Sequence, residues 1–467
     1  MTAPRGTFDA REHALVIGLG KSGLASCEIL RARGATVFAT DEKEPERLRD
    51  ALLQLALVGA EFVAPDQLPT IFDRLTAAVL SPGVPLDGAL VRRVRAAGVP
   101  VYSEIEVAYR LGQAPIVAVT GTKGKSTTTA LIGHLFAQAG RATRVGGNIG
   151  NPLIRETVSA GPDEWIVAEV SSFQLEAIRS FKPRVAVLLN VTPDHLDRYR
   201  SMDEYAEAKL RIFSNQGPHD VFIGNLDDPT IGAFAEGEGT LRIPSRAFWY
   251  GRTPRRMTTL YVRANRITYA PPGGLPRPVD IMPVDEIPLP GAHNVSNVLA
   301  AVLVGLSTGL DPETLRAGVR SFKALPHRLE TVAESDGVRF IDDSKSTTPG
   351  SVIAALEAFD MPVILIAGGK SKRTDFAAMA EAITRKAKRV VLIGEAADEI
   401  ASVLDPSIVS RAGSMDEAVA LARAQAVPGA VVLLSPGCAS FDMFDSAEHR
   451  GEMFARAVAG GSVAVHG

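Results

Sequence analysis

The chain has few cysteines, no long apolar run and no apolar segment of the kind found in export signals. Only two of its 467 residues are cysteine, Cys27 and Cys438, which is too few for a disulfide framework or a cysteine metal site. Both lie among small or apolar residues, so we expect them to be inert. No apolar run reaches the roughly 18 residues of a membrane-spanning helix, and residues 1–11 lack the apolar segment of an export signal. We therefore expect a cytoplasmic protein that is not inserted in a membrane.

An excess of positive charge is also missing. The 50 lysines and arginines face 53 aspartates and glutamates, and the densest basic cluster, Arg252 to Arg256, is short. This balance argues against a nucleic-acid-binding surface, whereas small anionic ligands need only a few local cations. The hydrophobic fraction of 46% and the charged fraction of 22% are typical of a folded enzyme, and the length indicates two to four domains.

What the chain does have is a repeating order of short apolar runs and amphipathic segments. This alternation predicts a doubly wound α/β architecture. Breaks near 111–115 and 323–326 divide the chain into expected domains of residues 1–112, 113–324 and 325–467. The apolar runs are 13–19, 36–40, 77–80, 99–102, 116–120, 165–171, 185–191, 363–367, 390–393 and 431–434.

Two segments of the middle region differ from this pattern. Residues 257–269 alternate in character and predict a β-hairpin. Residues 271–290 hold seven prolines, which predicts an exposed, extended connection outside the core.

A glycine-rich turn with a lysine lies between a strand-like run and a helical pattern. Residues 115–119 lead into Gly121-x-x-Gly124-Lys125-Ser126, and the amphipathic residues 130–139 lead out. Backbone N–H groups and a helix N-terminus there would face an anion, so the turn predicts bound ATP with magnesium. The spacing is shorter than the usual Walker pattern, which indicates a subclass in which the turn opens later. The alternative is a structural glycine turn in which Ser126 caps the helix.

A second nucleotide signal opens the chain. A strand-like run enters Gly18-x-Gly20-x-x-Gly23, and a second strand ends at Asp41. Alone, this pattern predicts a nicotinamide or flavin site as readily as a site for another phosphorylated nucleotide, and a purely structural turn is the third reading. The ATP loop in the next domain favours a nucleotide-linked substrate over hydride transfer.

Acidic and imidazole groups follow two apolar runs of the middle region. Glu169 lies toward the end of the run 165–171, and Asp194, His195 and Asp197 follow the run 185–191. Strand ends of open α/β sheets present ligands to the crevice, and hard oxygen atoms suit magnesium. We therefore interpret Glu169 and His195 as metal-site residues. The alternatives are a salt-bridged structural acid and an ordinary satisfied histidine.

In this order, the motifs resemble those of the Mur ligases over nearly the whole chain. Asp343-Ser344-Lys345 after Leu325–Arg328 resembles the branch that adds D-glutamate to UDP-N-acetylmuramoyl-L-alanine. The other matching segments are 18–23, 81–83, 120–128, 146–150, 169–176, 192–199, 293–297 and 434–440.

The resemblance implies a three-domain α/β fold. It comprises a Rossmann-like N-terminal domain that binds the UDP substrate, a central P-loop ATPase-type domain and a C-terminal Rossmann-like domain that closes on ATP and binds the amino acid. It also implies an ATP-driven amide ligase of peptidoglycan precursor synthesis, in which D-glutamate attacks an acyl phosphate. We expect it to act as a monomer.

The resemblance further implies roles for individual residues. Lys125, Glu169, His195 and Lys209 would be catalytic, and two magnesium ions would be held by Ser126, Thr127, Glu169, His195 and a carbamate on Lys209. The other ATP contacts would be Gly121, Thr122, Lys123, Gly124, Asn294, Asn297, Arg328 and Asp343. The UDP substrate would meet Lys21, Ser22, Asp41, Ser81, Asn148 and His195. D-Glutamate would meet Lys345, Thr347, Lys372, Ser440 and Ala447, with Lys370 as a rival to Lys372.

The sequence departs from the family pattern at a few positions. Ala447 stands where an aromatic residue is usual, so we expect altered affinity or stereochemical choice in the amino-acid pocket. Glu42 and Lys43 replace the residues often seen after Asp41, which leaves the uracil contacts open. Two other functions remain alternatives: a related ligase of the folylpolyglutamate type, and a nicotinamide-dependent dehydrogenase or a nucleotide-binding regulator without chemistry.

Overall fold

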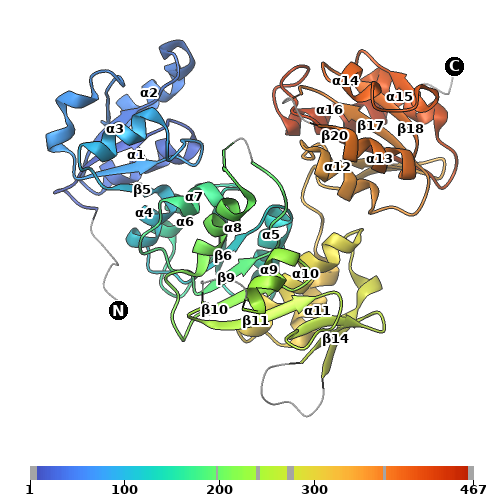
Figure 1. The fold of residues 1–467 in the computed structure, drawn as a ribbon, viewed down its shortest axis with the longest axis horizontal. Coiled ribbons are helices and arrows are strands. Elements are labelled where there is room, and N and C mark those ends of the chain that lie inside the picture. Colours follow the sequence, from blue (N-terminus) through green and yellow to red (C-terminus); the bar gives the residue numbers. More distant parts are fainter. Residues whose placement is uncertain (1–7, 196–197, 238–241, 271–277, 372–374, 461–467) are drawn as a thin grey trace. The chain divides into compact units, whose positions relative to one another are not determined.

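The computed structural model describes residues 8–195, 198–237, 242–270, 278–371 and 375–460 (Figure 1). Its contacts group into two compact units, one of Met1–Glu286 with Ser296–Phe322 and one of Ile287–Val295 with Lys323–Gly467. The strands form three separate sheets, and parallel pairing predominates in each. The doubly wound α/β prediction is thereby confirmed.

The first sheet has five parallel strands in the order β3-β2-β1-β4-β5. Its buried strands are almost entirely apolar, as expected when helices cover both faces. The strands are β1 His13–Ile17, β2 Thr36–Thr40, β3 Glu61–Phe62, β4 Ala77–Leu80 and β5 Val101–Ser103, with helices α1 Lys21–Ala32, α2 Arg49–Val58 and α3 Ala89–Ala96.

The second sheet has nine strands in the order β14-β13-β12-β11-β10-β9-β6-β8-β7. It is parallel from β7 to β12 and antiparallel through β13 and β14. The strands are β6 Ile116–Thr120, β7 Thr143–Gly147, β8 Trp165–Glu169, β9 Val185–Leu188, β10 Val221–Asn225, β11 Arg246–Gly251, β12 Leu260–Arg263, β13 Arg266–Tyr269 and β14 Val279–Pro283. The helices are α4 Glu104–Leu111, α5 Lys125–Gln138, α6 Leu153–Ser159, α7 Ser172–Glu176, α8 Met202–Leu210, α9 Pro229–Ala235, α10 Ala292–Ser307 and α11 Pro312–Ser321.

The antiparallel end of this sheet confirms one prediction and corrects another. Strands β12 and β13 form the hairpin expected within 257–269. The expectation of an extended connection over 271–290 is wrong for β14, which pairs with β13 and buries Ile281 and Met282. Prolines are tolerated here because β14 is an edge strand, with Pro283 at its end. Residues 271–277 lie outside the described part of the chain.

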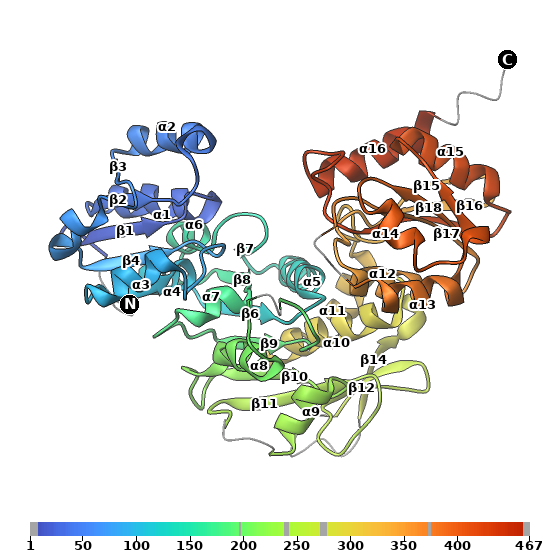
Figure 2. The same ribbon diagram turned by 45° about the horizontal axis from the view of Figure 1, so that its top comes forward.

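The third sheet has the order β15-β16-β20-β17-β18-β19, parallel except at β15. Alternate residues of β17 enter two cores, one under α12 and α13 and the other under α15 and α16, on opposite sides of the sheet (Figure 2). The strands are β15 Glu330–Ser335, β16 Val338–Asp342, β17 Val363–Gly368, β18 Ala387–Ile393, β19 Val409–Arg411 and β20 Val431–Gly437. The helices are α12 Pro349–Leu356, α13 Ala377–Lys386, α14 Ala397–Ala401, α15 Met415–Gln425 and α16 Ala447–Gly460.

Helix α4 connects the first two sheets. It packs against α6, and its buried Glu106 accepts backbone N–H bonds from Arg179, Ser180 and Phe181. Among the helices of the described residues, none combines the length and apolar character needed to cross a membrane.

Candidate active site

The glycine-rich turn connects β6 to α5 as the sequence predicts. Helix α5 begins at Lys125, and Gly124, with φ +82°, occupies its N-cap position. A Cβ at Gly124 would lie 2.3 Å from Oδ1 of Asn297, so both the left-handed backbone and the close approach of α10 require glycine. The loop and helix N-terminus therefore have the geometry of a phosphate cradle.

Asn190, to which the sequence analysis gave no role, shapes this loop. Its Oδ1 accepts the backbone N–H groups of Thr122 at 3.1 Å and Lys123 at 2.8 Å, and its Nδ2 donates to Lys123 O at 3.0 Å. Asn190 follows β9, the neighbour of β6 in the sheet. The sequence does show a polar residue directly after an apolar run. Its role could be interpreted only with the strand order, which places β9 next to β6.

Lys125 and Lys209 converge on one atom. Both Nζ groups donate to the carbonyl oxygen of Gly121 at 2.9 Å, and Lys125 also donates to Thr122 O at 2.9 Å. Lys209 is 1% exposed, and its Nζ lies 4.4 Å from the ring centroid of Tyr205. Burial, and next the positive charge of Lys125, hold the pKa of Lys209 well below the usual lysine value, while Asp194 opposes the shift.

Glu169 is a buried carboxylate at the carboxyl end of β8. Its Oε1 accepts a hydrogen bond from Asn148 Nδ2 at 2.9 Å. Its Oε2 is buried, and no hydrogen-bond partner for it is found among the described residues. The register of β6 and β8 places Glu169 beside Val119, two residues before Gly121. An unsatisfied carboxylate oxygen beside a phosphate loop suits a magnesium ligand.

His195 lies in an aromatic environment near the same sheet edge. Its ring centroid is 4.8 Å from Phe173 and 6.3 Å from Tyr205, and its Nε2 is 3.9 Å from Oδ2 of Asp194. The hydroxyl of Tyr205 lies 3.2 Å from Oγ1 of Thr122, so the ring beside His195 also contacts the phosphate loop. Asp197 lies outside the described residues.

The first sheet forms a separate cavity of about 570 Å³ at its carboxyl edge. Lys21, Ser22, Asp41 and Ser81 all line it, as do Glu42 and Lys43. Two of these polar side chains form hydrogen bonds with the backbone of the loops that line the cavity. Asp41 accepts backbone N–H bonds from Leu19 at 2.7 Å and Lys43 at 3.0 Å, and the Ser81 hydroxyl donates to Gly18 O at 2.7 Å.

In the third sheet, several of the predicted site residues lie just beyond the ends of β16 and β20. Asp343 is buried and accepts hydrogen bonds from Ser346 and, at 2.9 Å, from Ser435. Burial raises the pKa of Asp343 to about 6, against the effect of these hydrogen bonds. The Nζ of Lys345 pairs with Oε1 of Glu448, which lowers the pKa of Glu448 to about 2. Glu448, next to Ala447 at the start of α16, was not predicted.

The remaining predicted residues are distributed as follows. Ser440 is buried, Thr347 and Ala447 are half-buried, and Arg328 is exposed. Ser126, Thr127 and Asn297 belong to the unit of the phosphate loop, whereas Asn294, Arg328 and Asp343 belong to the other unit. Asn294 Nδ2 donates to Pro290 O at 2.7 Å. Lys372 lies outside the described residues.

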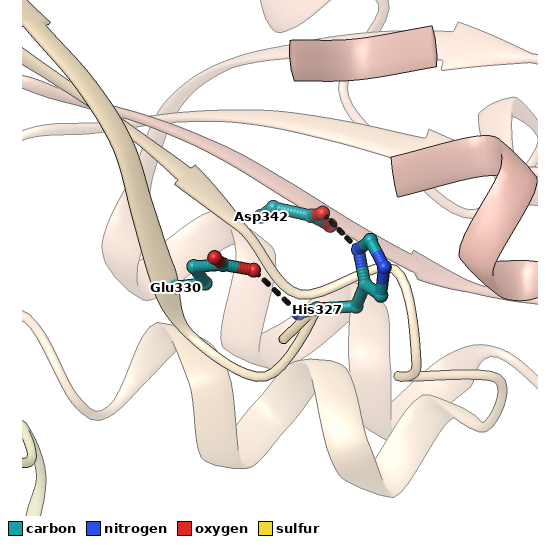
Figure 3. Close-up of side chains that lie close together, drawn as sticks. All are labelled: His327, Glu330 and Asp342. Atoms are coloured by element: carbon teal, nitrogen blue, oxygen red, sulfur yellow. Dashed lines mark hydrogen bonds and ion pairs between the residues drawn. The ribbon is translucent and has the colours of Figure 1, made fainter. Parts of the chain in front are cut away.

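One further group of potential cation ligands occurs in the described residues, and it does not contain the predicted metal residues. Figure 3 shows His327, Glu330 and Asp342 close together. The His327 Nδ1 atom lies 2.7 Å from Asp342 Oδ2, and Glu330 Oε2 accepts the backbone N–H of His327 at 2.7 Å. These internal hydrogen bonds pair the three residues with one another. They hold the turn at His327, which has φ +64° and directly precedes Arg328.

Comparison with known proteins finds similar proteins along most of the chain. Three family models match: the Mur ligase MurD-like N-terminal domain over residues 12–103, the Mur ligase middle domain over 119–305 and the Mur ligase glutamate ligase domain over 327–438. The UDP-N-acetylmuramoylalanine–D-glutamate ligase of Pelotomaculum thermopropionicum is 45% identical over 447 residues, covering 95% of this chain and 96% of that protein. The ligase of the same name from Koribacter versatilis is 42% identical, covering 95% and 96%.

Solved structures share the fold at low sequence identity. MurF from Acinetobacter baumannii matches with a TM-score of 0.62 at 18% identity, covering 95% of this chain and 93% of that chain. The UDP-N-acetylmuramate–alanine ligase MurC from Thermotoga maritima matches with a TM-score of 0.58 at 19% identity, covering 96% and 99%.

Proposed function

The chain belongs to the Mur ligase family, and on that premise we propose that it is the ATP-dependent ligase that adds D-glutamate to UDP-N-acetylmuramoyl-L-alanine in peptidoglycan precursor synthesis. The observation that carries this proposal is the 45% identity to a D-glutamate ligase over 95% of the chain. The phosphate loop and the nucleotide-sized cavity of the first sheet support it, because such a ligase needs sites for ATP and for a UDP-linked substrate.

The reaction begins with transfer of the γ-phosphoryl group of ATP to the carboxylate of the L-alanyl substrate, which releases ADP. The amine of D-glutamate then attacks the acyl phosphate, loses a proton and displaces phosphate, leaving an amide. Phosphoryl transfer depends chiefly on positioning and on neutralising charge. We assign these tasks to Lys125 and to the backbone N–H groups of Gly124–Thr127, because those of Thr122 and Lys123 donate to Asn190. We assign the adenine and ribose contacts to Asn294, Asn297, Arg328 and Asp343.

Magnesium is the metal of this family, and the side chains present fit it. Glu169 offers a buried carboxylate oxygen without a hydrogen-bond partner among the described residues, and Ser126 and Thr127 offer hydroxyls at the start of α5. Bound magnesium would supply positive charge for the transferring phosphoryl group. We propose His195 and a modified Lys209 as the ligands of a second ion.

The environment of Lys209 supports its carbamylation. A neutral amine attacks carbon dioxide, forming an N–C bond and releasing a proton to give the carbamate. Burial lowers the pKa of Lys209, which increases the share of its neutral amine. Carbamylation replaces a second cation beside Lys125 with an anion, which can hold a metal ion, whereas an ammonium would repel it.

We assign the cavity of the first sheet to the UDP moiety, through Lys21, Ser22, Asp41 and Ser81, and assign Asn148 and His195 to the rest of that substrate. The D-glutamate carboxylates require cations and donors, for which we propose Lys345, Thr347, Lys372, Ser440 and the backbone at Ala447. We further propose domains of residues 1–112, 113–324 and 325–467, and a cytoplasmic monomer.

Phosphate release tests the proposal directly. The protein is supplied with ATP, magnesium and UDP-N-acetylmuramoyl-L-alanine, with no amino acid, D-glutamate, L-glutamate or D-alanine. Turnover with D-glutamate alone is the expected result. Turnover with a different amino acid would keep the ligase reaction and overturn the specificity, and no turnover with any of them would overturn the proposal.

A further inference from the structure

Helix α16 places a fully buried arginine under the loops of the third sheet. Arg450 is 0% exposed and is the largest of the fully buried side chains in the described residues. Burial lowers the pKa of Arg450 to about 10, so the guanidinium is still a cation at neutral pH. A buried charge is costly unless hydrogen bonds and nearby charges compensate it, so the partners of this group indicate its purpose.

Those partners are backbone carbonyl oxygens from two loops. Nη2 donates to Ser344 O at 2.8 Å, and Nη1 donates to Cys438 O at 3.1 Å and to Ala439 O at 3.3 Å. Ser344 directly precedes Lys345, and Ala439 directly precedes Ser440. One guanidinium therefore bridges the backbone just before two residues that we assign to the amino acid.

The loop after β17 joins the same arrangement. Lys370 N–H donates to Ala439 O at 2.8 Å, and Ala439 N–H donates to Lys370 O at 3.2 Å. A Cβ at Gly369 would lie 2.3 Å from Ala439 O and 3.1 Å from Arg450 Nη1, so this loop also packs against the guanidinium. The three loops follow β16, β20 and β17, which are adjacent in the sheet, so their carboxyl ends lie at one edge.

The residue after Arg450 allows the helix to approach this closely. A Cβ at Gly451 would lie 2.3 Å from both His327 Nδ1 and Asp342 Oδ2, and 2.6 Å from Ser344 Oγ. Any larger residue would displace these side chains or push α16 away from the end of β16. The pair Arg450-Gly451 therefore brings the guanidinium to the carbonyl oxygens of the loops.

We propose that Arg450 is a positioning residue for the amino-acid pocket, whose guanidinium fixes the Ser344 and Ala439 backbones and thereby the spacing of Lys345 and Ser440. The identity of the amino acid rests on the proposed function, but the bridging of the loops does not. Within the described part of the chain, the hydrogen bonds of Arg450 all go to backbone oxygen atoms, so it acts on the pocket through other residues. Lysine cannot replace it, because a single ammonium lacks the planar fork that reaches carbonyl groups on both loops.

The test compares Arg450→Lys with Arg423→Lys. Arg423 of α15 is the control, because its Nη2 also donates to a backbone carbonyl, Val458 O at 2.8 Å, and its half-buried guanidinium lies over the Phe340 ring. We expect Arg450→Lys to raise the KM for D-glutamate about tenfold or more and the KM for ATP much less, because Ser344 also follows Asp343, which we assign to the nucleotide. Arg423→Lys should alter neither. Arg450→Ala should regain D-glutamate affinity when guanidinium ion is added, a rescue that a general loss of packing would not show.

A second readout needs no substrate. Hydrogen exchange of the backbone amides in residues 343–347 and 438–444 should be faster in Arg450→Lys than in the parent protein or Arg423→Lys. Exchange is measured without ligands, so the result tests the bridging of the loops even if D-glutamate proves not to be the substrate. Unchanged exchange with unchanged KM for D-glutamate would overturn the proposal. Failure of every Arg450 variant to fold, with or without guanidinium, would also overturn it, because Arg450 would then serve the stability of the whole domain.

Discussion

Lys125 and Lys209, which are 84 residues apart in the chain, donate to the same carbonyl oxygen, that of Gly121, each at 2.9 Å. Two ammonium groups on one acceptor repel each other, and Lys209 is the more deeply buried of the two. The pKa of Lys209 is therefore held well below the usual lysine value. This arrangement supports the proposed carbamylation of Lys209, with Lys125 as the remaining cation of the loop.

Replacing Lys209 should remove most of the ligase activity. In Lys209→Ala, the loss of the proposed carbamate should lower kcat by about a hundredfold or more, because charge stabilisation at the phosphoryl group is reduced. Bicarbonate or a short carboxylate should restore part of the rate by supplying oxygen atoms. Carbon-13 NMR with labelled bicarbonate should show a carbamate signal that the variant lacks. Lys182→Ala, which alters an exposed lysine 3.9 Å from Asp220, is the control. Full activity in Lys209→Ala would contradict the metal-bridging role.

Removing the carboxylate that pairs with Lys345 should improve binding of D-glutamate. Glu448→Gln frees the cation of Lys345 from its internal partner, so we expect the KM for D-glutamate to fall about two- to fivefold, in line with the strength of a partly exposed ion pair. Initial rates at varied D-glutamate give this value. Glu357→Gln, which breaks the exposed pair with Arg385, should leave KM unchanged. An increase in KM for Glu448→Gln would mean that the pair holds Lys345 in place for the substrate.

The small residue at the start of α16 should affect stereochemical choice. Ala447 is half-buried and adjacent to Glu448, and a ring at this position would fill space beside the proposed pocket. We expect Ala447→Phe to change the ratio of kcat/KM for D-glutamate over L-glutamate, whereas Ala447→Leu adds volume without a ring and serves as the comparison. If the ratio is the same in the parent protein and in Ala447→Phe, the residue does not control selectivity.

Stability should fall as the pH rises because of one buried acid. Glu104 is 1% exposed, its Oε1 accepts the Ile154 N–H at 2.7 Å, and burial raises its pKa from 4.5 to about 7. Between these values the folded protein binds more protons than the unfolded chain, so the free energy of unfolding decreases with rising pH, by up to about 3 kcal/mol.

Glu104→Gln should remove this dependence and stabilise the protein above about pH 7. Denaturant unfolding at about pH 5 and about pH 8 gives the difference. The exposed Glu61→Gln is the control, and a pH dependence in Glu104→Gln equal to that of the parent protein would show that Glu104 is ionised in the folded state.

The structure and the sequence agree best where a residue directly follows a strand. Gly18 follows β1, Asp41 follows β2 and Ser81 follows β4, and all three line one cavity. The phosphate loop is likewise predicted by its own glycines and the adjacent strand and helix, although its shape also depends on Asn190. The prediction for the proline-rich segment 271–290 is wrong for β14. Pairing with β13 buries Ile281 and Met282, and the number of prolines does not show which strand a segment pairs with.

The sequence by itself determined the alternation of strands and helices, the phosphate loop and the family, since each depends on residue types at short, fixed spacings. Only the tertiary structure decided which distant groups meet: Asn190 with the loop amides, Lys209 with Gly121, Glu448 with Lys345, and Arg450 with the carbonyl oxygens of the loops. The physical reason is the order of the strands. Parallel strands that are far apart in the chain become neighbours in a sheet, and their carboxyl ends then share one edge, which no local periodicity specifies.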